Sequence, residues 1–310
     1  MNVITLSILL LSLGLSNAWS RVTVVTTTTH VTDMVEDIGG NEVEVIGLMG
    51  PGVDPHLYKP SVRDVSTLRR ADAVFYSGLM LEGRMADLLM KTGHRGSKVY
   101  AVTEKIPETD LLGSVDYEGH FDPHVWFDAS LWIMGIDVVV EGLSEVDSEN
   151  AALYAERGAV LKKHYLETHQ WALERVQLIP ESQRILVTSH DAFNYFGRAF
   201  GFKVIAVQGR STASEAGLAD IANMVDLIKQ YNIRAIFVES SVSPAAIERV
   251  SKDSGVNIGG ELFSDAMGIP GHMVERFDGE SYDEGTWEGM VKHNINTIVE
   301  ALRPPALTAN

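Results

Sequence analysis

Cysteine is missing from the sequence, although the chain is 310 residues long. Its absence excludes a disulfide framework, a catalytic thiol and a metal site built from thiolates. We also expect no lipid anchor of the kind carried on an N-terminal cysteine.

Basic residues are scarce as well. The chain has 25 lysines and arginines against 42 aspartates and glutamates, which gives a formal net charge of −17. Because phosphate binding needs a basic face, this balance argues against nucleic acid as a partner.

The sequence also lacks the HExxH motif of zinc proteases and the nucleophile elbow of α/β hydrolases. We therefore expect a binding protein and not an enzyme.

Long hydrophobic runs are absent except at the N-terminus. An apolar stretch extends from Val3 to Leu15, and small residues follow at Ser16, Ala18 and Ser20. This stretch is too short to span a bilayer comfortably and is typical of a secretory signal. We predict a signal peptide at residues 1–20, with cleavage after Ala18 or Ser20, and a mature protein free in the periplasm.

The rest of the sequence alternates short β-branched runs with helical patterns. This βαβ rhythm predicts parallel sheets with helices on both faces. It occurs twice, so we predict an N-terminal α/β lobe at residues 21–146 and a C-terminal α/β lobe at residues 180–310. The predicted strands are 22–27, 43–48, 73–76 and 98–102 in the first lobe and 184–188, 203–207, 235–238 and 256–258 in the second.

One unusually long helical pattern separates the two lobes, at residues 147–179. Asp147 or Ser148 can cap its start, and Pro180 ends it. At 1.5 Å per residue it would extend for roughly 50 Å, enough to cross both lobes as one rigid backbone helix. Such a connection restrains hinge motion. The predicted apolar stripe of this helix consists of Leu153, Val160, Leu161, Tyr165, Leu173 and Val176.

Three of the ten histidines share a distinctive setting. His56 lies in a loop after a predicted strand, His124 lies just before a helix that begins near Asp128, and His190 directly follows the strand RILVT. In open parallel sheets, ligands bind beyond the carboxyl ends of the strands. His56 and His190 obey this rule from opposite lobes, so a site in the cleft between the lobes would collect both.

The tripeptide Asp-Pro-His occurs twice, ending at His56 and at His124. Proline fixes its own φ and favours an extended residue before it, so each imidazole is held on a stiff segment. Asp54 and Asp122 can accept the second ring N–H of a histidine and fix its tautomer. The repeat alone leaves a metal site and a chance recurrence equally open.

Asp265, in the segment GGELFSDAMG, is the fourth candidate. Three neutral nitrogens and one carboxylate can surround Zn²⁺ tetrahedrally, or Mn²⁺ if the carboxylate binds through both oxygens. Four protein ligands leave no coordination position for an activated water. This set therefore favours holding an ion over catalysis.

Several long motifs in one order resemble the TroA-like metal-binding subunits of ABC transporters, the family that includes the ZnuA and PsaA groups. The resemblance implies two α/β lobes joined by one long helix, with the metal ligands at His56, His124, His190 and Asp265. It also implies an ABC permease and ATPase as partners, and we expect the subunit to be a monomer. The motifs are LMGPGVDPHLYKPSVRDV, ADAVFYSGLMLE, FDPHVWFD, TSHDAFNYFGRAFGF, AIFVESS, GGELFSDAMG and MVKHNINTIVEAL.

Two details of the resemblance bear on the metal. Zinc-specific members often carry a long loop rich in histidine and acidic residues, where this chain has only SVDYEGHFD. Many manganese members carry glutamate at the third ligand position, where this chain has His190. The chain is therefore most similar to the TroA-type subgroup, which implies zinc or manganese as the captured ion.

Two other classes of function remain open from the sequence. A zinc-dependent hydrolase would need an open coordination position and a general base. An adhesin-like or organic-solute-binding module would line its cleft with aromatic and hydrogen-bonding groups. Among the remaining polar residues, we predict a cleft-wall or surface position for His30, loop positions for His120 and His272, and positions near the cleft floor for Glu215 and Glu239.

Overall fold

The computed structural model of the chain describes residues 21–93, 98–113, 119–276 and 279–304. The predicted signal peptide, residues 1–20, lies outside the described residues. Among the residues that the structure describes, no helix has both the length and the apolar character that crossing a membrane requires.

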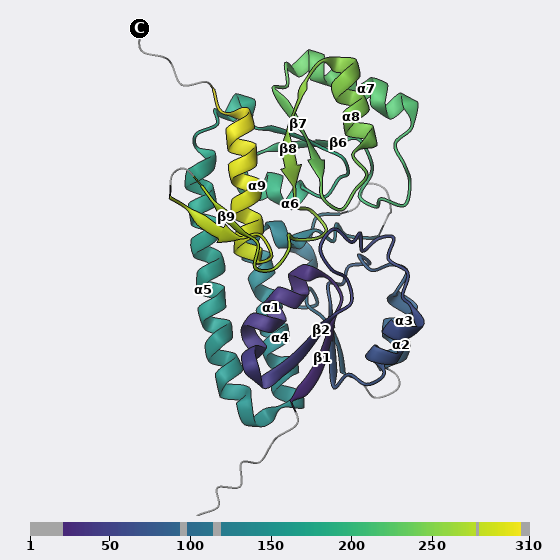
Figure 1. Cartoon of the computed structure of the whole chain (residues 1–310), viewed down its shortest axis with the longest axis vertical. Coiled ribbons are helices and arrows are strands. Elements are labelled where there is room, and N and C mark those ends of the chain that lie inside the picture. Colours follow the sequence, from purple (N-terminus) through teal and green to yellow (C-terminus); the bar gives the residue numbers. More distant parts are fainter. Residues whose placement is uncertain (1–20, 94–97, 114–118, 277–278, 305–310) are drawn as a thin grey trace, which may run out of the picture.

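A sheet of four parallel strands forms the centre of the N-terminal lobe (Figure 1). Its order is β2-β1-β3-β4, and in the register Val24 of β1 lies between Val45 of β2 and Ala73 of β3. These strands are rich in β-branched residues, which suit a sheet buried on both faces. The strands are β1 Val22–Thr26, β2 Val43–Gly47, β3 Ala73–Tyr76 and β4 Lys98–Ala101. The helices of this lobe are α1 Thr29–Gly39, α2 Val62–Leu68, α3 Ala86–Gly93 and α4 Ala129–Val146.

The C-terminal lobe contains two parallel strand pairs, β5 with β6 and β7 with β8. An antiparallel hairpin of two short strands, β9 and β10, was not predicted from the sequence. The strands are β5 Ile185–Thr188, β6 Lys203–Ala206, β7 Ala235–Glu239, β8 Asn257–Leu262, β9 Met273–Glu275 and β10 Ser281–Asp283. The helices are α6 Asn194–Phe200, α7 Leu218–Tyr231, α8 Ala245–Ser254 and α9 Trp287–Leu302. The predicted α/β fold with flanked parallel sheets is confirmed.

The long helix α5, Ala151–Val176, follows a 3₁₀ turn at Ser148–Asn150 and lies alongside both lobes (Figure 1). Its 26 residues correspond to a length of about 39 Å at the standard rise per residue. The helix packs against α1 and α4 of one lobe and α9 of the other. It is therefore the rigid connection that the sequence predicted, somewhat shorter than expected.

The prediction that Val160 belongs to the apolar stripe of α5 is wrong. Val160 is 65% exposed, whereas Tyr154, Leu161 and Tyr165 are buried. The cause is Gly158, whose missing side chain lets α5 approach α4 so closely that an added Cβ would lie 2.6 Å from Val140. Two residues farther along a helix is more than half a turn, so Val160 points away from this contact.

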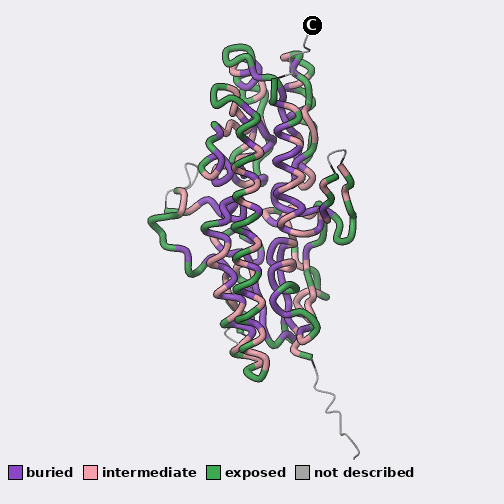
Figure 2. Tube along the Cα trace, turned by 90° about the vertical axis from the view of Figure 1, so that its left-hand side faces the viewer, coloured by how far each residue is buried: buried purple, intermediate pink, exposed green. Residues whose placement is uncertain are grey.

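The hydrophobic core continues from one lobe into the other, as Figure 2 shows by the buried trace along the middle of the molecule. Trp126 and Trp287 lie at this junction, where the Trp287 indole N–H donates to the Trp126 carbonyl at 2.9 Å. The Trp287 ring stacks on Tyr165 of α5 with ring centroids 4.1 Å apart. The lobes are therefore packed together and not merely tethered. The exact division at residues 146, 147, 179 and 180 stays a prediction.

Candidate metal centre

The two histidines of the N-terminal lobe lie on the Asp-Pro-His tripeptides. His56 lies in the loop that follows β2, and His124 precedes the 3₁₀ turn Val125–Phe127 that leads into α4. In each tripeptide an aspartate oxygen accepts the backbone N–H of the histidine two residues later, at 2.8 Å for Asp54 and 3.1 Å for Asp122. These short loops bring the Nε2 atoms of His56 and His124 to 3.4 Å from each other.

The other two candidates come from the C-terminal lobe. His190 follows β5, and its backbone N–H donates to the Glu239 carboxylate at the end of β7, at 2.9 Å. Asp265 follows β8. Both therefore lie beyond the carboxyl ends of parallel strands, as the sequence predicted. The His190 Nε2 atom lies 3.1 Å from an oxygen of Asp265.

The four side chains present their donor atoms to one point. One ligand atom from each residue lies within 4.8 Å of all the others. The carboxylate of Asp265 is 3.3 Å from His124 Nε2 and 3.7 Å from His56 Nε2. A tetrahedral ion with bonds of 2.0–2.1 Å has ligand-to-ligand edges of about 3.3 Å. The spacing of these donors therefore fits a small divalent transition metal ion, with all three imidazoles bound through Nε2.

Carboxylates also contact the far side of two imidazole rings. Asp122 lies 2.7 Å from His124 Nδ1, and Glu239 lies 2.6 Å from His190 Nδ1. Such contacts hold the proton on Nδ1 and leave Nε2 free to bind a metal. The predicted aspartate contact is thus present for His124, whereas Asp54 contacts only the backbone of His56. Of the two predicted cleft-floor glutamates, Glu239 is buried beside the site and Glu215 is exposed.

The electrostatics of the site follow from its burial. The side chains of His124, His190 and Asp265 are 0% exposed, and that of His56 is 6% exposed. Burial lowers the pKa of His56 to about 4. Burial also lowers the pKa of His124, but the Asp122 and Asp265 carboxylates outweigh it and raise the pKa to about 9. Burial opposes ionisation of Asp265, yet the surrounding imidazoles hold its pKa well below the usual value.

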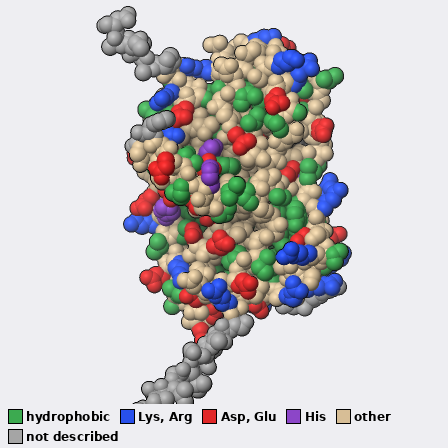
Figure 3. Space-filling model, in the orientation of Figure 1, with side chains coloured by type: hydrophobic (Ala, Val, Ile, Leu, Met, Phe, Trp, Pro, Cys, Tyr) green, Lys and Arg blue, Asp and Glu red, His purple; other side chains and the backbone are tan. Residues whose placement is uncertain are grey.

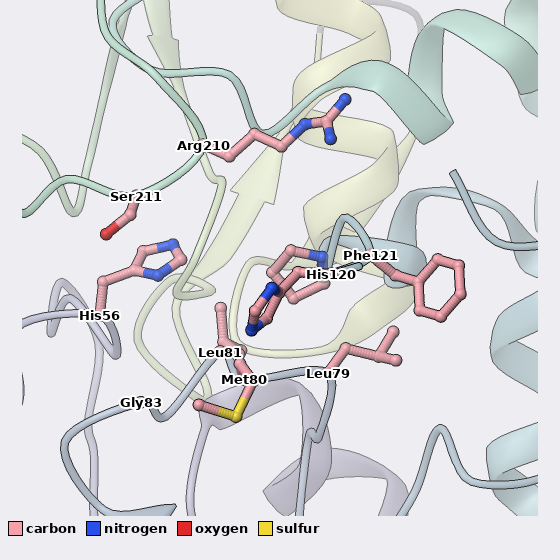
Figure 4. Close-up of a pocket in the computed structure, with 10 residues that line it drawn as sticks. His56, Leu79, Met80, Leu81, Gly83, His120, Phe121, Arg210 and Ser211 are labelled. Atoms are coloured by element: carbon pink, nitrogen blue, oxygen red, sulfur yellow. The ribbon is translucent and has the colours of Figure 1, made fainter. Parts of the chain in front are cut away.

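A cavity of about 220 Å³ leads from the surface to His56. Figure 4 shows Met80 and His120 at this mouth, with Arg210 and Ser211 of the C-terminal lobe on the opposite side. Leu79 and Met80 both adopt left-handed backbone conformations, with φ of 50° and 66°. Non-glycine residues rarely adopt this region unless the surroundings enforce it.

The carboxylate of Glu82 holds that turn in place. It is 2% exposed and accepts hydrogen bonds from the Thr27 hydroxyl at 2.6 Å and from the Ser77 backbone at 2.7 Å. The predicted motif ADAVFYSGLMLE thus builds the rim of the cavity. The motif carries no sign of this role, because a lone glutamate usually faces solvent.

His30 lies behind the site and not on its surface. The ring is buried at the start of α1 and stacks on Trp126, with centroids 4.4 Å apart and an angle of 24°. Burial lowers its pKa to about 3, so the ring is neutral. It is not among the four converging donors, and the prediction of a cleft-wall or surface position is wrong in that the side chain is fully enclosed.

Two further histidines of the described residues, His272 and His293, contact one carboxylate away from the four converging side chains. His272 Nδ1 lies 2.6 Å from Glu284, and His293 Nδ1 lies 3.1 Å from the same carboxylate. Figure 3 shows acidic and basic side chains interspersed over one face of the molecule.

Comparison with known proteins relates the whole chain to metal-binding proteins. The model of the ZnuA family, described as zinc-uptake complex component A, periplasmic, matches residues 24–301. The manganese-binding lipoprotein MntA of Bacillus subtilis is 44% identical over 292 residues, which are 93% of this chain and 92% of that protein. The zinc-binding protein TroA of Treponema pallidum is 42% identical over 285 residues, which are 90% of this chain and 88% of that protein.

The fold agrees with a solved structure as well. The periplasmic zinc-binding protein TroA from Treponema pallidum superposes with a TM-score of 0.85 at 40% identity, covering 92% of this chain and 100% of the solved chain. The similarity therefore includes both lobes, the long helix and the loops that carry the four converging side chains.

Proposed function

The chain belongs to the ZnuA family of zinc-uptake components, and from this premise we propose that it captures one zinc or manganese ion with His56, His124, His190 and Asp265 for an ABC importer. The observation that carries the proposal is the convergence of these four donor atoms within 4.8 Å. The protein is the substrate-binding subunit, and the ion is its cargo.

The composition of the site supports holding an ion in preference to using it. Three nitrogens and one carboxylate fill a tetrahedral shell from the protein alone, so a bound ion has no position left for an activated water. A hydrolytic zinc site keeps such a position open. The family consists of solute-binding proteins, and the geometry adds nothing in favour of the hydrolase or of an organic-solute module.

The choice between zinc and manganese depends on the ligand set. Three imidazole nitrogens favour zinc by intrinsic affinity, because zinc exceeds manganese in the general order for nitrogen and oxygen sites. The carboxylate of Asp265 has both oxygens within 3.7 Å of imidazole nitrogens, and binding through both would suit manganese. We propose that the site accepts either ion and binds zinc more tightly in a test tube.

The partners and the location follow from the same family. We propose that an ABC permease and its ATPase receive the ion and that the subunit acts as a monomer in the periplasm. Several relatives are lipoproteins by name, whereas this sequence contains no cysteine. Fractionation of the native cells tests the location, since recovery in the membrane fraction would contradict a free periplasmic protein.

Titration calorimetry on metal-stripped protein tests the site. Wild type should bind one equivalent of Zn²⁺, and the double variant His124→Ala/His190→Ala should lose this binding. The matched control is His272→Ala/His293→Ala, which removes two histidines that contact Glu284 on the surface. Loss of the tight equivalent in the control, or its retention in the site variant, would show that the ion binds elsewhere.

A further inference from the structure

Both Asp-Pro-His tripeptides have an aspartate oxygen directed away from the histidine. In each, one oxygen accepts the backbone N–H of the histidine, as described above. The second oxygen of Asp54 accepts a hydrogen bond from the hydroxyl of Thr212. The second oxygen of Asp122 lies 3.3 Å from Nε of Arg210 and also accepts a hydrogen bond from the side-chain amide of Asn194 on α6, at 3.2 Å. One short segment of the C-terminal lobe therefore contacts the carboxylates behind both metal-binding histidines of the N-terminal lobe.

This segment, residues 209–212, follows β6 and is called the clasp segment below. Arg210 and Thr212 are 9% and 8% exposed, so both contacts are shielded from water. Arg210 also lies 3.2 Å from Asp191, the residue after His190, and donates to the carbonyl of Gly113 in the other lobe. Its guanidinium therefore contacts an aspartate close to a metal-binding histidine in each lobe: Asp122 near His124 and Asp191 next to His190.

We propose that Arg210 and Thr212 are positioning residues that orient His56 and His124 only while the clasp segment is seated against the N-terminal lobe. The proposal rests on the metal-binding function. A carboxylate that loses its second partner can rotate, and the histidine that it fixes then loses its alignment with the ion. A partner that displaces this one segment would remove a contact from the carboxylate behind each N-terminal ligand, without touching the ion, and would leave Asp122 with only Asn194 on its second oxygen.

If the contacts of the clasp segment only hold the lobes together, a different result is expected. If the clasp segment only helped to close the lobes, removing one hydroxyl would lower the melting temperature of the metal-free protein and speed release only to a chelator too bulky for the cavity, which must wait for the lobes to open. If it positions the ligands, release to a small chelator that enters the cavity becomes faster as well. The test therefore measures the melting temperature and the release to both kinds of chelator on the full mature chain.

Thr212→Val removes the hydroxyl and keeps the shape, and Thr212→Ser restores the donor. Stopped-flow release of Zn²⁺ to a small chelator should be about three- to tenfold faster for Thr212→Val than for wild type, with recovery in Thr212→Ser. Thr92→Val is the matched control, because the buried Thr92 hydroxyl donates to a helix carbonyl of α3 far from the site. Release at the wild-type rate in Thr212→Val, or no recovery in Thr212→Ser, would overturn the proposal.

A double-variant cycle tests whether Thr212 acts through Asp54. In an Asp54→Ala background, Thr212→Val should cause no further acceleration, because the carboxylate that it holds is gone. Fully additive effects would overturn the proposed route. Arg210→Gln should change the release rate in opposite directions under the two explanations. Removing a positive charge near the metal dication would slow release, because the repulsion between them is lost. Removing a positioning residue would speed release. Slower or unchanged release in Arg210→Gln would exclude Arg210 from the role.

The same experiment separates this proposal from the metal-binding function. Wild type that retains no Zn²⁺ would contradict the metal site itself, and the positioning role with it. Wild type that retains one equivalent while Thr212→Val releases it at the same rate contradicts the positioning role alone.

Discussion

The two lobes support their metal-binding side chains in different ways. In the C-terminal lobe, His190 is held by Glu239 of the same lobe, and the chain before Asp265 is fixed by two hydrogen bonds between Asn294 and the Phe263 backbone, at 2.9 and 2.7 Å. In the N-terminal lobe, the aspartates behind His56 and His124 take partners from the opposite lobe: Thr212 for Asp54, and Arg210 and Asn194 for Asp122. The ring of His190 is therefore held from within its own lobe, whereas the aspartates behind His56 and His124 are held across the contact between lobes. The Asp265 segment is held from both sides, because the Trp126 indole N–H donates to the Ser264 carbonyl at 3.1 Å.

Removing the only anionic donor should cause the largest change. Asp265→Ala leaves a dipositive ion with three neutral ligands, so we expect the affinity for Zn²⁺ to fall by about a hundredfold, roughly 2.7 kcal/mol. Competition with a chelator of known affinity measures the loss. Asp226→Ala is the control, because Asp226 is an exposed acidic residue on α7. Equal affinity in the two variants would place the carboxylate ligand elsewhere, first at Glu239.

Loss of the Glu239 contact within the C-terminal lobe should lower the metal affinity less than loss of a ligand does. Glu239→Gln keeps the size of the side chain but weakens the contact to His190 Nδ1, and loss of such a partner costs about ten- to a hundredfold in metal affinity. We expect a loss near the middle of this range, measured by the same competition. Glu215→Gln, at an exposed position, should bind like wild type. If Glu239→Gln also did, the C-terminal half would not depend on this carboxylate.

Protons should compete with the ion at one histidine of each lobe. Burial lowers the pKa of both rings, but carboxylates outweigh it and raise the pKa of His124 to about 9 and that of His190 well above its usual value, so each ring carries an extra proton at pH 7 that an ion must displace. The affinity should therefore rise as pH increases from 7 towards 9 and fall as pH decreases, by about tenfold per unit for each displaced proton. Calorimetry in buffers of different ionisation enthalpy counts the released protons. Identical heats in all buffers would mean that both rings are already neutral.

The smallest expected effect concerns the choice of metal. Exchanging the nitrogen of His190 for a carboxylate oxygen should weaken zinc relative to manganese by several-fold, about 1 kcal/mol. Glu239 lies 2.6 Å from this side chain, so His190→Glu is made in the Glu239→Gln background to avoid two facing carboxylates. Glu239→Gln alone is the control. An unchanged ratio of zinc to manganese affinity would indicate that position 190 does not contact the ion.

Much of the fold was predictable because the β-branched runs are long enough to show their pattern. The strand at 73–76 has the predicted bounds. The strands β9 and β10 have three residues each, which is too short for an alternation to be visible. The segment TTTTH is composed of weak helix formers, yet α1 begins at Thr29 because His30 packs on Trp126.

The site was predictable for a different reason. The ends of parallel strands have a known place in the fold, so the sequence predicted that His56 and His190 lie together. The repeated Asp-Pro-His drew attention to His124, and the full set of four ligands came from the resemblance to the TroA-like family. Thr212 contacts Asp54, which lies 158 residues earlier in the chain. Arg210 contacts Asp122, which lies 88 residues earlier. No local pattern carries such information.

The narrow access to the site determines how an ion can leave. Of the four converging side chains, only His56 lines the mouth of the cavity, and the other three are sealed from solvent. Departure is then a stepwise ligand substitution in which an incoming water or chelator atom must first take the place of the His56 nitrogen. The exchange is associative, so its rate rises with the concentration of the competing ligand. A chelator too bulky for a cavity of about 220 Å³ would remove the ion only as fast as the lobes themselves open.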